Sequence, residues 1–325
     1  MLRTGLEELL GIEHPILLAP LGPWSTPELT AAVSNAGGLG SQATAGLSLE
    51  SIREQLARVQ DLTPRPFVIN FSLRWMDEQA LELALGMNPA VISFSHGDPG
   101  HLPERAHDVG ALVMHMVNTV TQARQAAERG VDIIIAQGSE AAGFGGMVGT
   151  MTLLPQVVRA VQPIPVVAAG GIADGIGVAA AWLLGAQAVS MGTRFLASTE
   201  AGIDGQLKQA IVEAEAEDAV KAAYGDLLIG PAGIGQYPIT PRVLRSSLVD
   251  EWNRRWEEAK GDPSQLRAEA DEAVRQGRAD ELLPLAVGQS AGMIHEILPA
   301  GEIIRGVMAE ADKTLRRAEV PEAIL

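Results

Sequence analysis

The stretch "PVVAAGGIADGIGVAAAWLLGAQAVSMGT", residues 165–193, decides the fold class. Two short apolar runs, 165–171 and 188–193, flank a segment of small and apolar residues. Nearly continuous apolar character is typical of buried parallel strands, and the middle segment is typical of a helix that crosses over between two strands. The glycines and Asp174 make the stretch too interrupted for a membrane span. The sequence therefore predicts a strand, a helix and a second strand.

The same alternation runs through the first two-thirds of the chain. The segments between the apolar runs have helical spacing, and several begin with Ser, Thr or Asp and end with Gly, as capped helices do. About eight βα units in about 200 residues predict an α/β fold of the (β/α)8 TIM-barrel type. A doubly wound sheet is the alternative, but "LGPWSTPE" after the first strand lacks the glycine-rich fingerprint of that fold. The predicted strands are residues 15–20, 38–43, 66–71, 90–95, 111–117, 132–137, 165–171 and 188–193.

A change in composition after about residue 204 predicts a second unit. The segments between 204 and 285 are charged and helical in pattern, and they contain few β-branched residues. We expect a helical cap at 204–285, beside the mouth of a barrel formed by residues 1–203 and 286–325. Trp252 and Trp256 lie four residues apart on one helix face, so we expect them to pack that helix on the barrel.

The composition excludes several classes of function. The chain has 325 residues, a formal net charge of -16 and no Cys. The negative charge disfavours nucleic acid and anionic membrane surfaces, which leaves a small molecule as the expected partner. The absence of Cys excludes disulfides, a thiol nucleophile and Cys-ligated metals. The N-terminus lacks the apolar core of a signal peptide, so we expect a cytoplasmic protein. The oligomeric state stays open, with a homodimer as one option.

Two predicted loops favour a phosphate site. Gly170 and Gly171 follow the seventh predicted strand, and Gly192 and Thr193 follow the eighth. In TIM barrels the loops after these strands commonly bind phosphate through backbone N–H groups near a helix N-terminus. The simpler alternative is that the glycines only allow a tight turn. Together the loops favour a mononucleotide such as FMN, with its phosphate at the two turns and its ring over the barrel mouth.

An ordered series of motifs resembles the nitronate monooxygenase family, formerly called 2-nitropropane dioxygenases. The motifs include "PILLAPLG", "FVINF", "VISFSHGDP", "DIIIAQGSEAAGFGG" and "GQSAG", and the similarity extends from about residue 5 to 200 and resumes near 286. The resemblance implies a TIM barrel with non-covalent FMN that oxidises alkyl nitronates with O2. It also extends to FMN-type enoyl-acyl-carrier-protein reductases, so NAD(P)H-dependent reduction of quinones or enoyl thioesters is the alternative function. By motif, the implied FMN contacts are Ala19, Pro20, Leu21, Asn70, Gln137, Gly138, Gly143, Gly170, Gly171, Met191, Gly192 and Thr193.

Phe144 departs from the family pattern. The loop after the sixth strand typically reads like "EAGGH" in the family, and Phe144 stands at the position of that His. A positioned base contributes about 100- to 10,000-fold to a rate, and phenylalanine cannot accept a proton. Oxidation of a nitronate, which is already an anion, does not need this base, whereas proton abstraction from a neutral nitroalkane does. Hydride transfer from NAD(P)H does not need it either, and a barrel that binds without turnover is a third option.

The loop "SFSHGDPGH" after the fourth strand offers a replacement base. His96 is the predicted catalytic residue, because an ordinary His pKa suits acid–base chemistry, and His101 is a weaker candidate. The alternative is that His96 only contacts loop backbone. We predict no metal site, since His96, Asp98 and His101 lack a regular element that would aim them at one ion.

Three further side chains border the expected site. Trp24 and Phe144 are predicted to form apolar walls of the substrate pocket, although Trp24 could equally belong to the core. Glu140 lies in the glycine-rich loop at 137–146. We expect it to make a salt bridge or a capping contact at the following helix, with an active-site role as the alternative.

Overall fold

The structure is a computed structural model that describes residues 4–225, 233–234, 237–238, 240–259, 262–276 and 285–318. Eight parallel strands form one sheet in the order β1-β9-β8-β6-β5-β4-β3-β2. A parallel bridge between Leu17 and Leu39 joins the first and last strands of that order and closes the barrel. The predicted TIM barrel is therefore confirmed. The barrel strands are β1 (Ile16–Leu18), β2 (Gly40–Ala43), β3 (Phe67–Ser72), β4 (Val91–Ser95), β5 (Leu112–Val117), β6 (Ile133–Gln137), β8 (Val166–Ala169) and β9 (Ala188–Met191).

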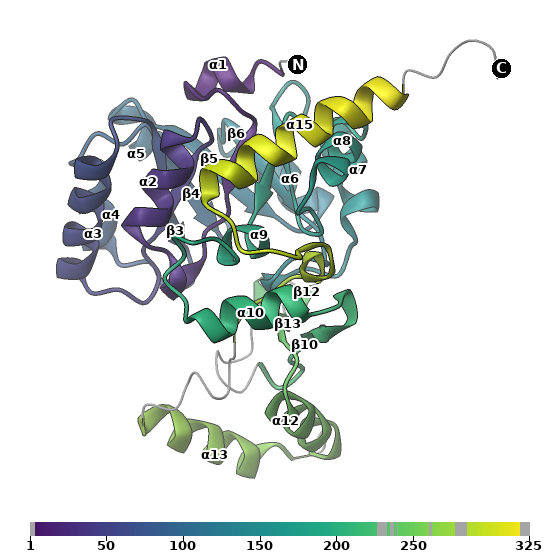
Figure 1. Cartoon of the computed structure of the whole chain (residues 1–325). Helices are drawn as coiled ribbons and strands as arrows, with labels where there is room; N and C mark the ends of the chain where they lie inside the picture. The colour runs from purple at the N-terminus through teal and green to yellow at the C-terminus, as the bar shows by residue number, and fades with distance from the viewer. Residues whose placement is uncertain are drawn as a thin grey trace.

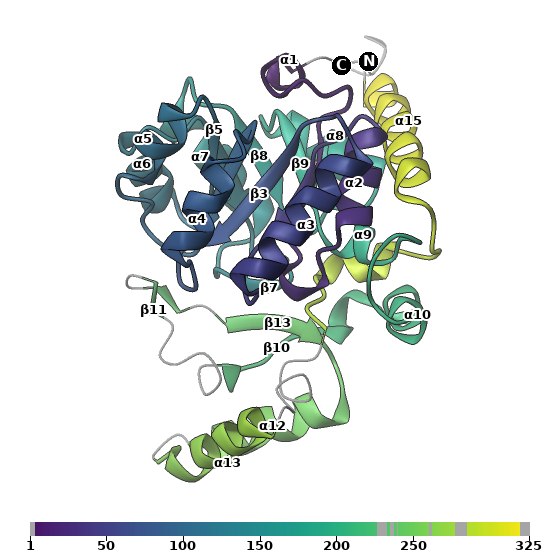
Figure 2. The same cartoon turned by 90° about the vertical axis from the view of Figure 1, so that its left-hand side faces the viewer.

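Helices surround the barrel (Figures 1 and 2). Five of them begin at a Ser, Thr or Asp whose side chain accepts a backbone N–H of the first turn, as the sequence predicts. Amphipathic α3 buries Ile52, Leu56 and Val59 and leaves its charged face in water. The outer helices are α1 (Leu6–Leu10), α2 (Pro27–Asn35), α3 (Leu49–Leu62), α4 (Glu78–Leu85), α5 (Leu102–Asp108), α6 (Val120–Glu128), α7 (Thr150–Val161) and α8 (Gly175–Leu183).

Strand alternation divides the core into two clusters. Side chains such as Val68, Met114 and Ile135 point into the barrel and form an inner cluster. The intervening strand residues, such as Ile69 and Ile134, pack outward against the helices in a larger cluster. Burying each such side chain contributes about 1.5–3 kcal/mol, so the closed barrel is a packed core that fixes the strand ends.

The C-terminal segment packs against the barrel. A short 3-10 turn, η3 (Gln289–Met293), leads into α15 (Ala300–Ala318), which lies along α8 and α2 (Figure 1). Val307, Met308 and Ala311 of α15 belong to the outer cluster. Among the helices that the structure describes, none combines the length and apolar character that crossing a membrane requires.

The segment after residue 204 differs from the expected all-helical cap. The helix α10 (Gly205–Glu213) places Ile211 in the outer cluster of the barrel, and the chain then forms β10 (Ala219–Lys221). This strand pairs with β13 (Thr240–Leu244), which also pairs with β7 (Gly143–Gly145) in the barrel loop after β6. A two-stranded ladder of β11 (Gly233–Ile234) and β12 (Tyr237–Pro238) lies between them in sequence. We propose that the boundary of the cap lies nearer residue 219 than residue 204.

Two helices complete the cap on the side away from the barrel (Figure 2). They are α12 (Ser247–Glu258) and α13 (Ser264–Arg275). Trp252 packs with Tyr224 and Leu266 in a separate hydrophobic cluster, and Trp256 borders the same cluster. The expectation that these tryptophans pack on the barrel is wrong, because β10 and β13 lie between α12 and the barrel and supply the apolar partners.

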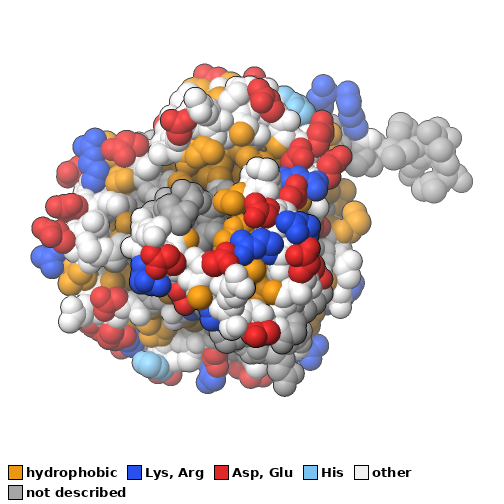
Figure 3. All heavy atoms as spheres, turned by 90° about the horizontal axis from the view of Figure 1, so that it is seen from below, with side chains coloured by type: hydrophobic (Ala, Val, Ile, Leu, Met, Phe, Trp, Pro, Cys, Tyr) orange, Lys and Arg blue, Asp and Glu red, His pale blue; other side chains and the backbone are white. Residues whose placement is uncertain are grey.

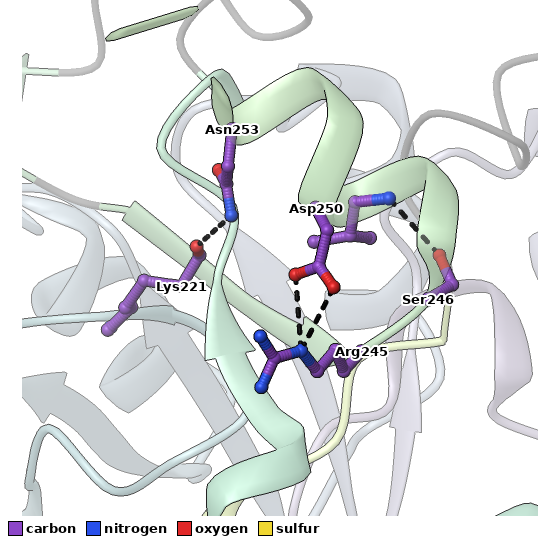
Figure 4. A network of polar contacts seen from close by, with 6 residues as sticks. Lys221, Arg245, Ser246, Asp250 and Asn253 are labelled. Carbon is purple, nitrogen blue, oxygen red and sulfur yellow. Dashed lines mark hydrogen bonds and ion pairs between the residues drawn. The ribbon is translucent and has the colours of Figure 1, made fainter. Parts of the chain in front are cut away.

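Polar contacts hold α12 on its sheet (Figure 4). Asn253 donates its amide to the backbone carbonyl of Lys221 at 3.1 Å and accepts the Ala223 N–H at 2.7 Å. Arg245 pairs with Asp250 at 3.1 Å, and Ser246 caps the helix by accepting the Val249 N–H. Hydrogen bonds thus join α12 to β10, and strand pairing joins the cap to the site loop.

Candidate functional site

A cavity of about 580 Å³ opens at the carboxyl ends of the barrel strands. Its volume is that of an ordinary ligand pocket. Every second residue near the end of a barrel strand faces inward, so the strand ends supply the floor. These floor residues are Ala43, Asn70, Ser72, Ser93, Ser95, Met116, Ile135, Gln137, Ala169 and Ser190.

The two predicted phosphate-binding turns line this same cavity. Gly170 and Gly171 have φ angles of 98° and 74°, which L side chains rarely adopt. Within the described residues, the N–H groups of Gly171 and Thr193 have no protein acceptor. The turn therefore requires the glycines, and residues with unpaired backbone N–H groups line the cavity.

The N-terminus of α8 offers fewer free N–H groups to a phosphate than the sequence indicates. Asp174 accepts the Gly177 N–H at 2.7 Å, and Glu310 of α15 accepts the Gly175 N–H at 2.8 Å. These two carboxylates occupy the donors that we expected an anion to use. The open donors belong instead to the turns that precede α8 and begin α9 (Thr193–Leu196).

Polar side chains of the floor are positioned by their neighbours. Gln137 accepts a hydrogen bond from Asn118 Nδ2 at 2.8 Å, and this bond leaves its own Nε2 without a partner among the described residues. Asn70 donates to Ser93 Oγ at 3.2 Å. The floor therefore presents neutral amides and hydroxyls, which can donate to and accept from the edge of a heterocyclic ring.

Ten of the twelve predicted cofactor residues line the cavity. They are Ala19, Pro20, Leu21, Asn70, Gln137, Gly143, Gly170, Gly171, Gly192 and Thr193. Met191 and Gly138 do not line it. Met191 faces the outer cluster, and its carbonyl accepts the Ala19 N–H at 3.0 Å. Gly138 is a glycine because a Cβ there would collide with Thr150.

The loop that carries Phe144 is held at both ends. Glu140 accepts the Thr150 N–H at 2.9 and 3.0 Å and the Thr150 hydroxyl at 2.9 Å, which confirms its expected capping role at α7. Arg242 of β13 donates two hydrogen bonds to the Ser139 carbonyl, at 2.9 and 3.2 Å. Phe144 itself lies in β7 opposite Pro241. The cap therefore helps to fix the wall of the cavity.

Three rings form an aromatic cluster at the cavity. Phe144 lies 5.5 Å from Trp75 and 5.7 Å from His96 between ring centroids, and Trp75 lies 6.2 Å from His96. The two contacts of His96 are edge-to-face, a geometry that aromatic pairs favour. Trp24 also lines the cavity. Phe144 and Trp24 thus lie where the sequence places the pocket walls.

His96 is the one titratable side chain among the described residues that line the cavity. It has a left-handed φ of 61°, and its Nδ1 lies 3.0 Å from Ser72 Oγ. The pKa of His96 is lowered to about 4, mainly because burial disfavours the charged imidazolium. A hydrogen bond with the Phe144 backbone opposes this shift, and the nearby positive charge of Arg74 adds to it. The imidazole is therefore neutral at neutral pH and able to accept a proton.

The other members of the His96 loop lie apart from the cavity. His101 is exposed at the start of α5 and does not line the cavity. Asp98 pairs with Arg129 at 2.8 Å. Across the described part of the chain, no group of three or more His, Cys, Asp or Glu side chains is arranged to hold a metal ion.

Sequence reasoning missed several lining residues. Ser93 and Ser190 stand at alternate positions of predicted strands, so strand periodicity could have identified them as inward-facing. Gly288 and Ser290 lie in the "GQSAG" motif, and the Gly288 N–H donates to Thr193 Oγ1 at 2.9 Å. Trp75 lies in the loop after β3, where the sequence carries no signal for it.

A closed (β/α)8 barrel whose loops after β8 and β9 line a cavity is the architecture of TIM-barrel enzymes, which commonly bind phosphate groups at these loops. A model of the nitronate monooxygenase family matches residues 3–310. The chain therefore belongs to the nitronate monooxygenase family, and it is an oxidoreductase of the FMN type.

Individual relatives and solved structures are similar to this chain over most of its length. A "(3aS,4S,5R,7aS)-5-hydroxy-7a-methyl-1-oxo-octahydro-1H-indene-4-carboxyl-CoA dehydrogenase" of Mycobacterium tuberculosis is 36% identical over 77% of this chain and 68% of its own length. FabK from Thermotoga maritima has a TM-score of 0.86 and 34% identity, over 98% of this chain and 99% of FabK. A nitroalkane oxidase from Streptomyces ansochromogenes has a TM-score of 0.79 and 28% identity, over 97% of this chain and 100% of its own.

Proposed function

We propose that the protein binds FMN and oxidises alkyl nitronates with O2. The observation that carries this proposal is that the open N–H groups of Gly171 and Thr193 and the neutral floor at Asn70 and Gln137 belong to one cavity. Backbone donors suit a phosphate, and amides suit the polar edge of a flavin ring. The donor set therefore fits FMN, and its size fits a cavity of about 580 Å³.

The bound flavin would supply the electron-accepting chemistry and return electrons to O2. The chain would bind the phosphate at the two turns and orient the ring over the floor. Phe144 offers no proton acceptor, so a substrate that arrives as an anion suits this site better than a neutral nitroalkane. His96 is neutral at neutral pH and would accept a proton or a hydrogen bond at the cavity wall.

A second function is favoured by one finding. The Mycobacterium tuberculosis relative is named as a dehydrogenase of a CoA thioester. An NAD(P)H-dependent reductase of enoyl thioesters or quinones would use the same flavin site, and hydride transfer to the flavin would need no base at Phe144. The two functions differ in the compound that reduces the flavin.

Anaerobic reduction separates the two functions. The purified FMN-loaded protein would be mixed in turn with ethyl nitronate, NADH and NADPH, and the loss of flavin absorbance followed. We expect the nitronate to reduce the flavin, and O2 to restore the absorbance. Reduction by NADH or NADPH alone would support the reductase. A protein that binds no FMN would support a barrel without turnover.

A further inference from the structure

The cavity has a polar floor and an apolar mouth. The floor carries amides and hydroxyls, whereas the outer lining consists of aromatic and aliphatic side chains. Among the described residues that line the cavity, none carries a formally charged side chain at neutral pH. Burying a charge without a partner is costly, so the outer lining disfavours a charged group. The outer apolar residues are Pro23, Trp24, Ala45, Leu47, Trp75 and Phe144.

Trp75 is unusually open for a large aromatic residue. It lines the cavity, yet its exposed fraction is 44%. Its backbone is fixed, because the Trp75 N–H donates to the Ser72 carbonyl at 2.9 Å and the Leu73 N–H donates to the Ser95 carbonyl at 2.8 Å. A fixed, partly exposed aromatic ring beside a cavity is a surface that an apolar ligand can cover.

Phe144 extends this surface. Its ring tilts by 52° against Trp75 at 5.5 Å between centroids, and strand pairing in β7 holds its backbone. The guanidinium of Arg74 lies 5.5 Å from the centre of the Trp75 ring. Viewed from the cap end, the molecule shows hydrophobic side chains gathered beside acidic and basic ones (Figure 3).

We propose that Trp75 and Phe144 form a wall that binds the hydrocarbon chain of the substrate, and that Trp75 makes the enzyme select substrates by chain length. The proposal rests on the proposed function, because it requires the reacting group to lie over the flavin ring. The substrate class is then an unbranched alkyl or acyl compound whose chain is uncharged. Each methylene group that the wall covers should tighten binding about fourfold.

Binding of unreactive ligands tests the wall independently of the reaction. Dissociation constants of straight-chain primary alcohols with two to eight carbons would be measured by calorimetry on the FMN-loaded protein. The same measurements would be made on Trp75→Ala, on the conservative Trp75→Phe, and on Leu183→Ala. Leu183 is a matched control, because it is a large apolar residue with 71% exposure that does not line the cavity.

We expect the affinity of the unsubstituted protein and of Leu183→Ala to rise about fourfold per added carbon. Trp75→Ala should reduce this increment to less than twofold, and Trp75→Phe should retain most of it. Equal affinities for all chain lengths in the unsubstituted protein would overturn the proposal. A gain in affinity per added carbon that Trp75→Ala leaves unchanged would overturn it as well. The same variants assayed with ethyl and hexyl nitronate then report on the reaction. Chain-length-dependent binding without nitronate turnover would support the wall formed by Trp75 and Phe144 and contradict the proposed oxidation of nitronates.

Discussion

Ser72 Oγ lies 3.0 Å from Nδ1 of His96, and this contact joins the ends of two neighbouring barrel strands. His96 keeps a left-handed backbone there, a conformation that costs energy in most residues other than glycine. Phe144 and Trp75 both contact the His96 ring in edge-to-face geometry. The structure thus holds one neutral imidazole in a fixed orientation at the cavity wall.

Replacement of His96 tests its proposed role. We expect His96→Gln to lower kcat with neutral nitroethane at least tenfold, because removal of its proton needs a base and a positioned acid–base group contributes about 100- to 10,000-fold where it acts. FMN affinity should change less than threefold. His101→Gln is the matched control, since His101 follows in the same loop and lies outside the cavity. Equal kcat values for His96→Gln and the unsubstituted protein would exclude a catalytic role.

Restoration of a base at residue 144 is a separate test. Phe144→His should raise the rate with neutral nitroethane about tenfold or more, because a base can then abstract its proton. The rate with ethyl nitronate should change little, since that substrate is already an anion. Phe144→Leu, which adds no base, controls for loss of the aromatic ring. An unchanged rate with nitroethane in Phe144→His would show that the missing base is not what limits the reaction.

The turn after β8 should tolerate no side chain when the cofactor binds. Gly171 has a φ of 74°, and an added Cβ would lie 3.3 Å from Glu140 Cβ. We expect Gly171→Ala to weaken FMN binding at least tenfold, because the strained turn would misdirect its open N–H. Gly130→Ala is the control, since Gly130 has a φ of 80° and open space around it, precedes β6 at the end of that strand opposite the cavity, and does not line the cavity. Each substitution costs about 1–2 kcal/mol of stability. Similar FMN affinities for the two variants would refute the assignment of the turn.

Stability should depend on pH through His115. This residue is 2% exposed on β5, and burial lowers its pKa to about 4, although contacts with the Gly97 backbone and Asp98 raise it. Between pH 6.5 and 4 the unfolded chain binds more protons at this position than the folded chain does. The free energy of unfolding therefore falls as pH falls through that range, and His96 adds to the same trend.

His115→Leu should flatten this dependence. We expect the loss of unfolding free energy between pH 7.5 and pH 4.5 to shrink by about 1–3 kcal/mol, measured by urea denaturation at each pH. His295→Gln, a change at an exposed residue, should keep the dependence of the unsubstituted protein. The same slope in all three proteins would contradict the buried neutral state of His115.

The barrel was predictable because its signal is local. Each strand is a short apolar run, and the structure places all eight within the predicted ranges or one residue beyond. The cap was less predictable, because β7 is a glycine-rich segment that becomes a strand only by pairing with β13, about 97 residues later. The formation of β7 as a strand depends on a partner that is distant in sequence, and no local sequence pattern predicts that pairing.

The same distinction applies to the site. The glycine turns at 170–171 and 192–193 carry a motif, and both line the cavity as expected. No local sequence pattern indicates that Glu310 occupies a donor of α8, because that contact spans 135 residues. Trp75 was missed for a similar reason: its role depends on the neighbouring Phe144, which a different loop supplies.

We propose that the two turns hold the phosphate of FMN. The most direct test is equilibrium titration of the cofactor-free protein with FMN and, separately, with riboflavin, which has the same ring but no phosphate. Charge-assisted hydrogen bonds from two or more backbone N–H groups predict that one FMN binds per chain, about 100-fold more tightly than riboflavin. Equal affinities, or no binding of either compound, would contradict the claim.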